Sequence, residues 1–172
     1  MPTFYTLDRR GVLRENESLN LNLTPAANPY QTPTYATGLS NHGVLYHTEF
    51  GMHNPGNVPS GVIEYGLELV RQLHFPEKPS RLQSMFACEE IDHAKHFRGI
   101  SQSKVNTPIF EVTTDNFHRG DMNIFNAGCN MAEFHHRLMT YWQGETFPLS
   151  PEYEPFWEVV IPLPVVIGRQ IA

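Results

Sequence analysis

A single carboxylate, Glu158, stands at the start of a strongly apolar stretch near the end of the sequence, FWEVVIPLPVVIGRQI. A carboxylate buried among apolar side chains must be paired with a cation, protonated or used in chemistry. Side chains alternate between the two faces of a strand, so the alternative is that Glu158 lies on an exposed edge. The pattern leaves both interpretations open, and Glu145 is the second candidate for a catalytic acid.

A second stretch whose residues could take part in chemistry covers positions 75–97, FPEKPSRLQSMFACEEIDHAKHF. Its two prolines predict a turn, and residues 81–88 then read as a strand that carries Ser84 and Phe86. Arg81, at the start of this strand, is either a structural anchor of the turn or a phosphate contact.

The nine histidines do not form a metal motif. His93 and His96 are one helical turn apart, but Cys88 belongs to the preceding strand and no second ligand pair has zinc-like spacing. We therefore predict no metal site. The triplet at 119–121, Arg-Gly-Asp, is expected to form a turn, and the sequence has neither a phosphate-binding glycine loop nor a G-x-S-x-G elbow.

Hydrophobic periodicity predicts the elements that position these residues. We expect strands at 3–7, 19–23, 81–88, 109–113, 157–161 and 165–167, and helices at 60–73, 89–98 and 130–142. Ser60 is expected to cap the first helix, Gly99 to end the second, and Asn130 with Glu133 to form a capping box on the third, which Gly144 ends. The buried stripes are expected to be Val62, Ile63, Leu69, Val70 and Leu73 on the first helix, and Met131, Phe134, Leu138 and Tyr141 on the third.

Strands and helices are interspersed without a regular βαβ repeat, which indicates an α+β fold with a mixed or mostly antiparallel sheet. A chain of 172 residues fits a single domain, 1–172, in which residues 24–59 are expected to form a long loop that is functional or mobile.

Composition excludes several classes of protein. The net charge of −6 argues against broad electrostatic capture of nucleic acid, so any such binding must use a local patch. Two cysteines are too few for a disulfide scaffold and are interpreted as reduced thiols of a cytoplasmic protein. The first residues have no apolar signal core and no apolar run approaches membrane-spanning length, so we expect no membrane association.

The order of three motifs resembles that of ADP-ribosyltransferase-like domains, in particular a bacterial and phage branch of that family. The motifs are FPEKPSRLQSMF, YWQGE at the end of the last helix, and the closing strand that begins FWEVVI. The resemblance covers most of the chain and implies split mixed or antiparallel sheets with flanking helices around a cleft that binds NAD as the substrate.

The resemblance also implies roles for individual residues. Glu158 would be the catalytic carboxylate, and Ser84 would position the ribose of NAD next to it. The predicted NAD-binding residues are Tyr5, Thr6, Arg9, Arg81 and Phe86, with Arg10 as an alternative to Arg9 and His47 as an alternative to Thr6. Thr6 departs from the family pattern, because members usually carry His or Arg there.

The implied function is an NAD-dependent ADP-ribosyltransferase, a toxin or effector that modifies a nucleic acid or a specific protein, with an antitoxin or immunity protein as a further partner. Phe156 stands where arginine-modifying members carry Glu or Gln, so arginine analogues are expected to be poor acceptors. The alternatives are an NAD glycohydrolase and an inactive ligand- or protein-binding module on the same fold.

Overall fold

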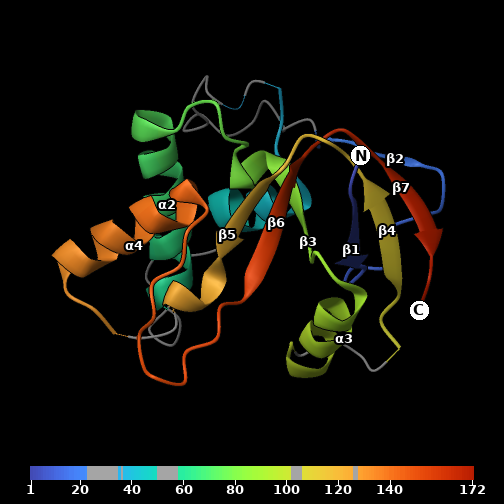
Figure 1. Ribbon diagram of the computed structural model, residues 1–172. Helices are drawn as coiled ribbons and strands as arrows, with labels where there is room; N and C mark the ends of the chain where they lie inside the picture. The colour runs from blue at the N-terminus through green and yellow to red at the C-terminus, as the bar shows by residue number, and fades with distance from the viewer. Residues whose placement is uncertain (23–34, 36, 50–57, 102–105, 126–127) are drawn as a thin grey trace.

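The computed structural model describes residues 1–22, 35, 37–49, 58–101, 106–125 and 128–172. It has an α+β fold with two antiparallel sheets and helices packed around them (Figure 1). The first sheet has the order β1 (Thr3–Leu7), β4 (Ile109–Thr113), β7 (Val165–Gln170) and β2 (Ser18–Leu19). The second has the order β3 (Ser84–Ala87), β6 (Trp157–Pro162) and β5 (His118–Asp121).

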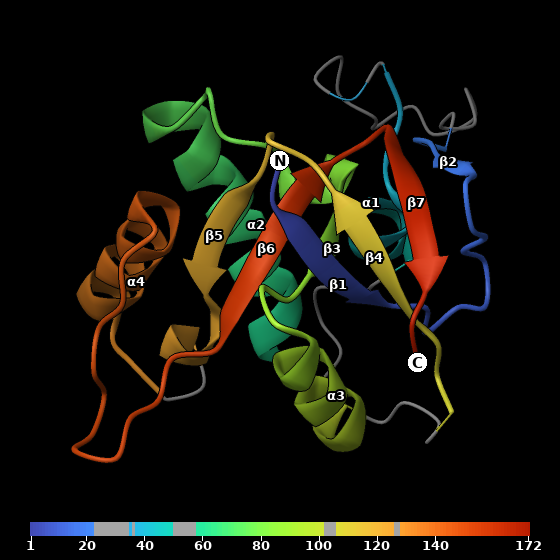
Figure 2. The same ribbon diagram turned by 45° about the vertical axis from the view of Figure 1, so that its right-hand side comes forward.

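The helices lie on both sides of this arrangement (Figure 2). The α-helices are α1 (Asn41–Val44), α2 (Val58–His74), α3 (Ile91–Ile100) and α4 (Met131–Gln143). A π-helical turn, η2 (Leu45–Glu49), continues α1, and two 3₁₀ turns are η3 (Arg81–Gln83) and η4 (Met122–Phe125). Helix α4 packs on β5 and on α2, α3 packs on β1, and α1 packs on β3 and η3.

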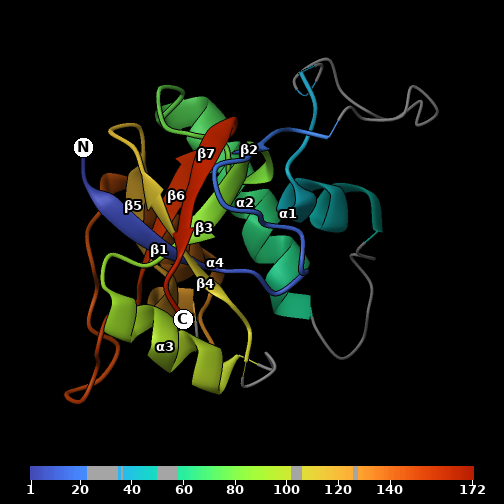
Figure 3. The same ribbon diagram turned by 90° about the vertical axis from the view of Figure 1, so that its right-hand side faces the viewer.

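The two sheets are joined where β1 passes β3. Tyr5 and Cys88 exchange two backbone hydrogen bonds of 2.9 and 2.8 Å, and the Thr6 hydroxyl donates to the Phe86 carbonyl at 2.7 Å. These bonds keep β1 and β3 in contact, whereas the strands diverge beyond them (Figure 3). The position of the join decides where a cavity can form between the sheets.

Strand β6 is the central strand of its sheet, and both of its faces are buried. Val159 and Ile161 belong to the apolar core that β6 shares with β1, β4 and β7, while Val160 packs in the core formed by α2 and α4. Glu158 has the same parity as Val160 and pairs with Gly120 of β5. The structure therefore excludes the exposed-edge alternative for Glu158.

Several sequence-based expectations are confirmed. Strands β1 and β4 have the predicted bounds, β6 is one residue longer, and β7 extends three residues further than expected. The capping box of Asn130 and Glu133 is present, and Gly144 ends α4 with φ = 76°, a left-handed conformation that glycine adopts without strain.

Helix α2 begins at Val58, so Ser60 is not its N-cap, and the predicted buried stripe is largely wrong. Leu69 and Leu73 are 40% and 74% exposed, whereas Glu64 and Glu68 are buried. The reason is electrostatic: Glu64 pairs with Arg81 and Glu68 with Arg71, so two charged side chains occupy the inner face.

Other corrections concern element ends. Residues 81–83 form η3 instead of the first part of β3, α3 runs through Gly99 to Ile100, and β2 is two residues long. The triplet at 119–121 lies in β5 and forms no turn. Met131 is 87% exposed because it directly follows the N-cap of α4.

The expected loop at 24–59 contains α1 and η2, and its remaining residues lie largely outside the described part of the chain. In the described ranges, no helix has the length and apolar character that a membrane crossing requires, and no group of three metal-ligating side chains occurs.

Candidate functional site

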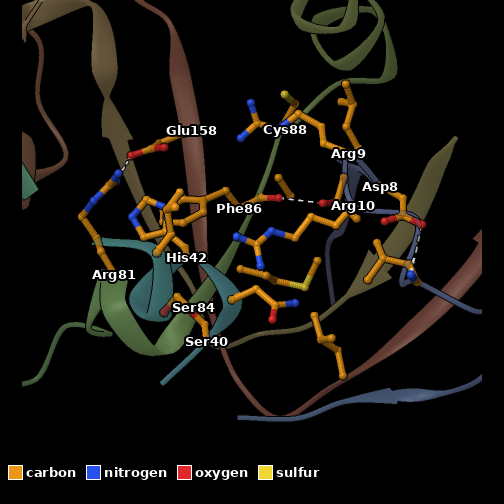
Figure 4. Close-up of a pocket in the computed structure, with 18 of the residues that line it drawn as sticks. Asp8, Arg9, Arg10, Ser40, His42, Arg81, Ser84, Phe86, Cys88 and Glu158 are labelled. Carbon is orange, nitrogen blue, oxygen red and sulfur yellow. Dashed lines mark hydrogen bonds and ion pairs between the residues drawn. The ribbon is translucent and has the colours of Figure 1, made fainter. Parts of the chain in front are cut away.

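A cavity of about 360 Å³ lies between the two sheets, beside the contact of β1 with β3 (Figure 4). We call it the inter-sheet cavity. Its walls come from β1 and the turn after it, from α1, from η3 and β3, and from the ends of β6. All seven residues predicted to act at the site line it: Tyr5, Thr6, Arg9, Arg81, Ser84, Phe86 and Glu158.

Glu158 presents a largely buried carboxylate to this cavity, with 12% of the side chain exposed. Its Oε1 atom accepts hydrogen bonds from Arg81 Nη1 and from the Tyr141 hydroxyl, the latter at 2.6 Å. Both donors bond to the same oxygen, Oε1, and no described residue forms a hydrogen bond with Oε2. A fixed, charged carboxylate with one free oxygen is suited to stabilising positive charge on a bound molecule.

Arg81 is the centre of a buried charge cluster. Its guanidinium donates to Glu64 at 2.9 and 2.7 Å, to Glu158 and to Tyr141, and it stacks 4.6 Å from the centre of the Phe86 ring. The sequence left Arg81 as either a structural anchor or a phosphate contact. The geometry supports the structural anchor, because protein groups already accept the hydrogen bonds of its guanidinium.

The pKa values within the cluster follow from burial and pairing. Burial would raise the pKa of Glu64, but the adjacent Arg81 and then His42 outweigh it and hold that pKa below its usual value. Burial and the neighbouring Glu158 raise the pKa of Tyr141, so Tyr141 remains a hydroxyl donor. With two carboxylates and one guanidinium, the cluster has an excess of negative charge.

Ser84 lies at the wall of the cavity, but its side chain faces the protein. The hydroxyl donates to the Ser80 carbonyl at 2.6 Å, and the residue exposes no surface to solvent. This hydrogen bond closes the turn that carries Arg81. The geometry therefore supports a structural role for Ser84 and not a role in binding ribose.

Replacing Ser84 with alanine is expected to lower the free energy of unfolding by about 0.5–1.5 kcal/mol. The Ser80 carbonyl loses one hydrogen bond but keeps the one from the Gln83 amide at 3.0 Å, which limits the loss. Urea denaturation measures it, with exposed Ser18→Ala as the control. Unchanged stability combined with weaker NAD use would instead assign Ser84 to ribose binding.

Two arginines lie at the rim of the cavity, on the turn after β1. Arg9 and Arg10 are both exposed and line the opening, with Arg9 lying 5.7 Å from the centre of the Phe97 ring. Asp8 shapes this turn, because its carboxylate accepts the amides of Val12 and Leu13 at 2.9 and 3.0 Å. The rim therefore offers positive charge above an interior that is net negative.

Aromatic side chains form much of the remaining wall. Phe97 of α3 and Phe156, just before β6, pack with their ring centres 5.3 Å apart. The Phe156 amide donates to Asp121 at 2.9 Å, which fixes the entry of the chain into β6. Cys88 also lines the cavity, but burial raises the pKa of its thiol to about 11, so it is a poor nucleophile.

The part of the cavity wall that comes from α1, α2, η3, β3 and the start of β6 falls within a recognised family. The family described as a protein of unknown function (DUF2441) matches residues 35–161, most of the chain. The chain belongs to this family. A comparison with curated proteins found no match. The family match includes Arg81, Ser84, Phe86 and Glu158, whereas β1 and the arginine-bearing turn precede it.

Of the groups that contact the charge cluster, His42 of α1 and Glu64 of α2 line the cavity and were missed in the sequence. Both lie within the family match, and their atoms Nε2 and Oε2 are 3.2 Å apart. The sequence offered one signal for Glu64, its position on the apolar side of the helical pattern. That position indicates a site residue only when its buried partner, Arg81, is known.

The two alternative candidates lie elsewhere. Glu145 is exposed just after α4 and does not line the inter-sheet cavity. His47 packs against Tyr35, with ring centres 5.3 Å apart, and is likewise absent from the cavity wall.

Proposed function

We propose that the inter-sheet cavity binds NAD and that the protein is an NAD-dependent ADP-ribosyltransferase. One observation carries the proposal: side chains chosen from three distant segments of the sequence line one cavity between two split sheets. The volume of about 360 Å³ is at the lower end of the usual range for ligand pockets, roughly 300–1,000 Å³. It suits the nicotinamide–ribose half of the molecule, with the rest extending over the rim.

The charges of the cavity fit the two ends of NAD. The nicotinamide ring carries a positive charge, which matches the net negative cluster around Glu158 and Arg81. The pyrophosphate is anionic, and Arg9 and Arg10 at the rim are the exposed cations in its path. Tyr5 and Phe86 supply aromatic walls for the planar ring.

The proposed chemistry is cleavage of the bond between nicotinamide and ribose. Nicotinamide leaves with the electron pair of that bond, and positive charge develops on the ribose as in glycoside hydrolysis. The free oxygen of Glu158 would face this charge, while Arg81 and Tyr141 hold the other oxygen in place. The carboxylate thus acts as an electrostatic stabiliser and not as a nucleophile.

The acceptor side of the site is apolar. Phe156 stands where arginine-modifying members of the proposed family carry Glu or Gln, and Phe97 packs against it in the cavity wall. This wall favours a flat or apolar acceptor group, such as a nucleobase or a specific protein side chain. A toxin or effector role, with an antitoxin or immunity partner, follows from the same resemblance.

The hydrogen bonds within the charge cluster favour a second candidate function, a binding module without catalysis. Glu158 is bound to Arg81 and Tyr141, and the Ser84 hydroxyl is turned toward Ser80. A cavity in which these polar groups already bond to protein groups is able to bind a ligand through shape and charge alone.

Incubation with NAD labelled in its adenylate half, with and without cell lysate, tests these functions. Label in material that nuclease or protease removes supports transfer, and free ADP-ribose supports the glycohydrolase alternative. Unmodified NAD that nevertheless binds the protein supports the binding module. Efficient labelling of agmatine would contradict the role assigned to Phe156.

A further inference from the structure

His42 occupies a position in the inter-sheet cavity that the proposed chemistry has not used. Its imidazole lines the cavity from α1, with ring centres 4.6 Å from Phe86 and 4.7 Å from Tyr46 (Figure 4). Ser40 caps α1 by accepting the Gly43 amide at 3.1 Å and donates to the Leu82 carbonyl, also at 3.1 Å. A Cβ on Gly43 would overlap that carbonyl, so α1 is held tightly against η3. The backbone that carries His42 is therefore held in place against η3.

The environment of the ring fixes which nitrogen carries the proton. The Nε2 atom is buried and lies 3.2 Å from Glu64 Oε2, close enough for electrostatic attraction, although the ring is not aligned for a hydrogen bond to Glu64 or to any other described group. A lone pair on Nε2 would face the carboxylate oxygen and be repelled, so the proton of the neutral ring lies on Nε2. This leaves the lone pair on Nδ1, for which the described residues provide no recorded partner.

Glu158 is poorly placed to accept a proton. Its Oε1 atom already accepts from Arg81 and Tyr141, and protonating the carboxylate would remove the charge that pairs with Arg81. Any transfer to a hydroxyl, amine or water nevertheless releases a proton from the acceptor. The cavity therefore needs a second group for that task.

We propose that His42, oriented by Glu64, is the general base that takes the proton from the acceptor in the inter-sheet cavity. This inference rests on the proposed function and adds a second residue to it, so that two side chains carry out two different tasks. Glu158 stabilises the ribose, and His42 activates the nucleophile. The arrangement has the logic of other oriented histidine bases, in which a carboxylate sets the tautomer.

The acceptor oxygen or nitrogen forms a bond to the ribose carbon as the bond to nicotinamide breaks, and nicotinamide leaves with that electron pair. The proton of the acceptor passes to Nδ1, and the imidazolium that forms is stabilised by Glu64. Bulk water then removes the proton and restores the neutral ring.

The charged and titratable groups around His42 come from each element packed against α1. Glu64 of α2 attracts the protonated ring and Arg81 of η3 opposes it, while Tyr46 and His47 belong to η2 and Phe86 of β3 carries no charge. Since the base acts in its neutral form, nicotinamide release should rise with pH along a limb that reports His42.

The first test uses the free protein and ¹⁵N-edited NMR of the nine histidines, with His42 assigned by its loss in His42→Gln. We expect the neutral His42 ring to carry its proton on Nε2, and Glu64→Gln to weaken that preference. A proton on Nδ1 in the wild-type protein would overturn the inference without bearing on NAD binding.

The second test compares nicotinamide release and NAD affinity. For His42→Gln we expect a loss of about 10²-fold in rate, disappearance of the rising pH limb, and an NAD Kd within about threefold of the wild-type value. The control is His47→Gln, which alters a histidine outside the cavity wall and should leave rate and pH profile unchanged.

Two outcomes would overturn the role of His42, and they are distinguishable from failure of the proposed function. If wild type and His42→Gln release nicotinamide at equal rates, His42 is not the base although NAD cleavage stands. If His42→Gln loses rate and NAD affinity equally, the residue only shapes the cavity. If the wild type neither binds nor cleaves NAD, the proposed function fails and the inference fails with it.

Discussion

Replacing Arg81 with methionine is expected to lower the free energy of unfolding by about 3–5 kcal/mol. The change keeps much of the length of the side chain but leaves the buried carboxylates of Glu64 and Glu158 without their shared cation. Two uncompensated negative charges in a buried site are among the most destabilising arrangements in proteins. Urea denaturation at pH 7 measures the loss.

The stabilisation that Arg81 provides should depend on pH. The native pKa of Glu64 is lowered from its ordinary value of 4.5, so its pairing stabilises the fold above that pH and the stabilisation is lost as the pH falls. The Arg81→Met penalty should therefore shrink in acid. As a control, Arg169→Met removes an exposed ion pair with Glu111 and should leave the free energy of unfolding nearly unchanged. Equal stability of Arg81→Met and wild type would contradict the buried cluster.

Glu158→Gln is expected to reduce the rate of nicotinamide release by about 10²–10³-fold, the usual cost of losing one electrostatic stabiliser. The glutamine carbonyl can still accept hydrogen bonds from Arg81 and Tyr141, so the fold should persist. The variant removes charge, not volume, and its effect should appear in kcat more than in NAD affinity. Chromatographic assay of nicotinamide, with a parallel thermal melt, measures both.

Glu145→Gln supplies the matched control for that experiment. It makes the same chemical change at an exposed position outside the cavity wall. We expect wild-type nicotinamide release from this variant. Full activity in a well-folded Glu158→Gln protein would remove Glu158 from the mechanism, and loss of activity in Glu145→Gln would restore the second candidate.

Local chemistry in the sequence predicted much of the fold. Strands β1 and β4 alternate clearly, and α4 begins with Asn130 and Glu133 and ends at Gly144, so its ends are set by its own residues. The inward direction of Glu158 could not be predicted in the same way. It depends on β6 being flanked by β3 and β5, which only the sheet order reveals.

Helix α2 shows why the rest of the site was not predictable. Its apolar residues suggested one buried face, but Glu64 and Glu68 turn inward to reach Arg81 and Arg71. The Glu64–Arg81 pair joins positions 17 residues apart in α2 and η3, and periodicity does not detect such pairing. For the same reason His42 was missed, since its significance depends on Glu64 being buried beside it.

The most direct test of the central claim is NMR chemical-shift mapping of the ¹⁵N-labelled protein with NAD. Binding in the inter-sheet cavity predicts shifts concentrated at the amides of Tyr5, Phe86, Cys88 and Phe156, which line one cavity from strands of both sheets and from the residues next to them. The same map for Glu158→Gln should show similar binding. Saturating NAD with no shifts, or with shifts confined to residues outside this cavity, would contradict the account.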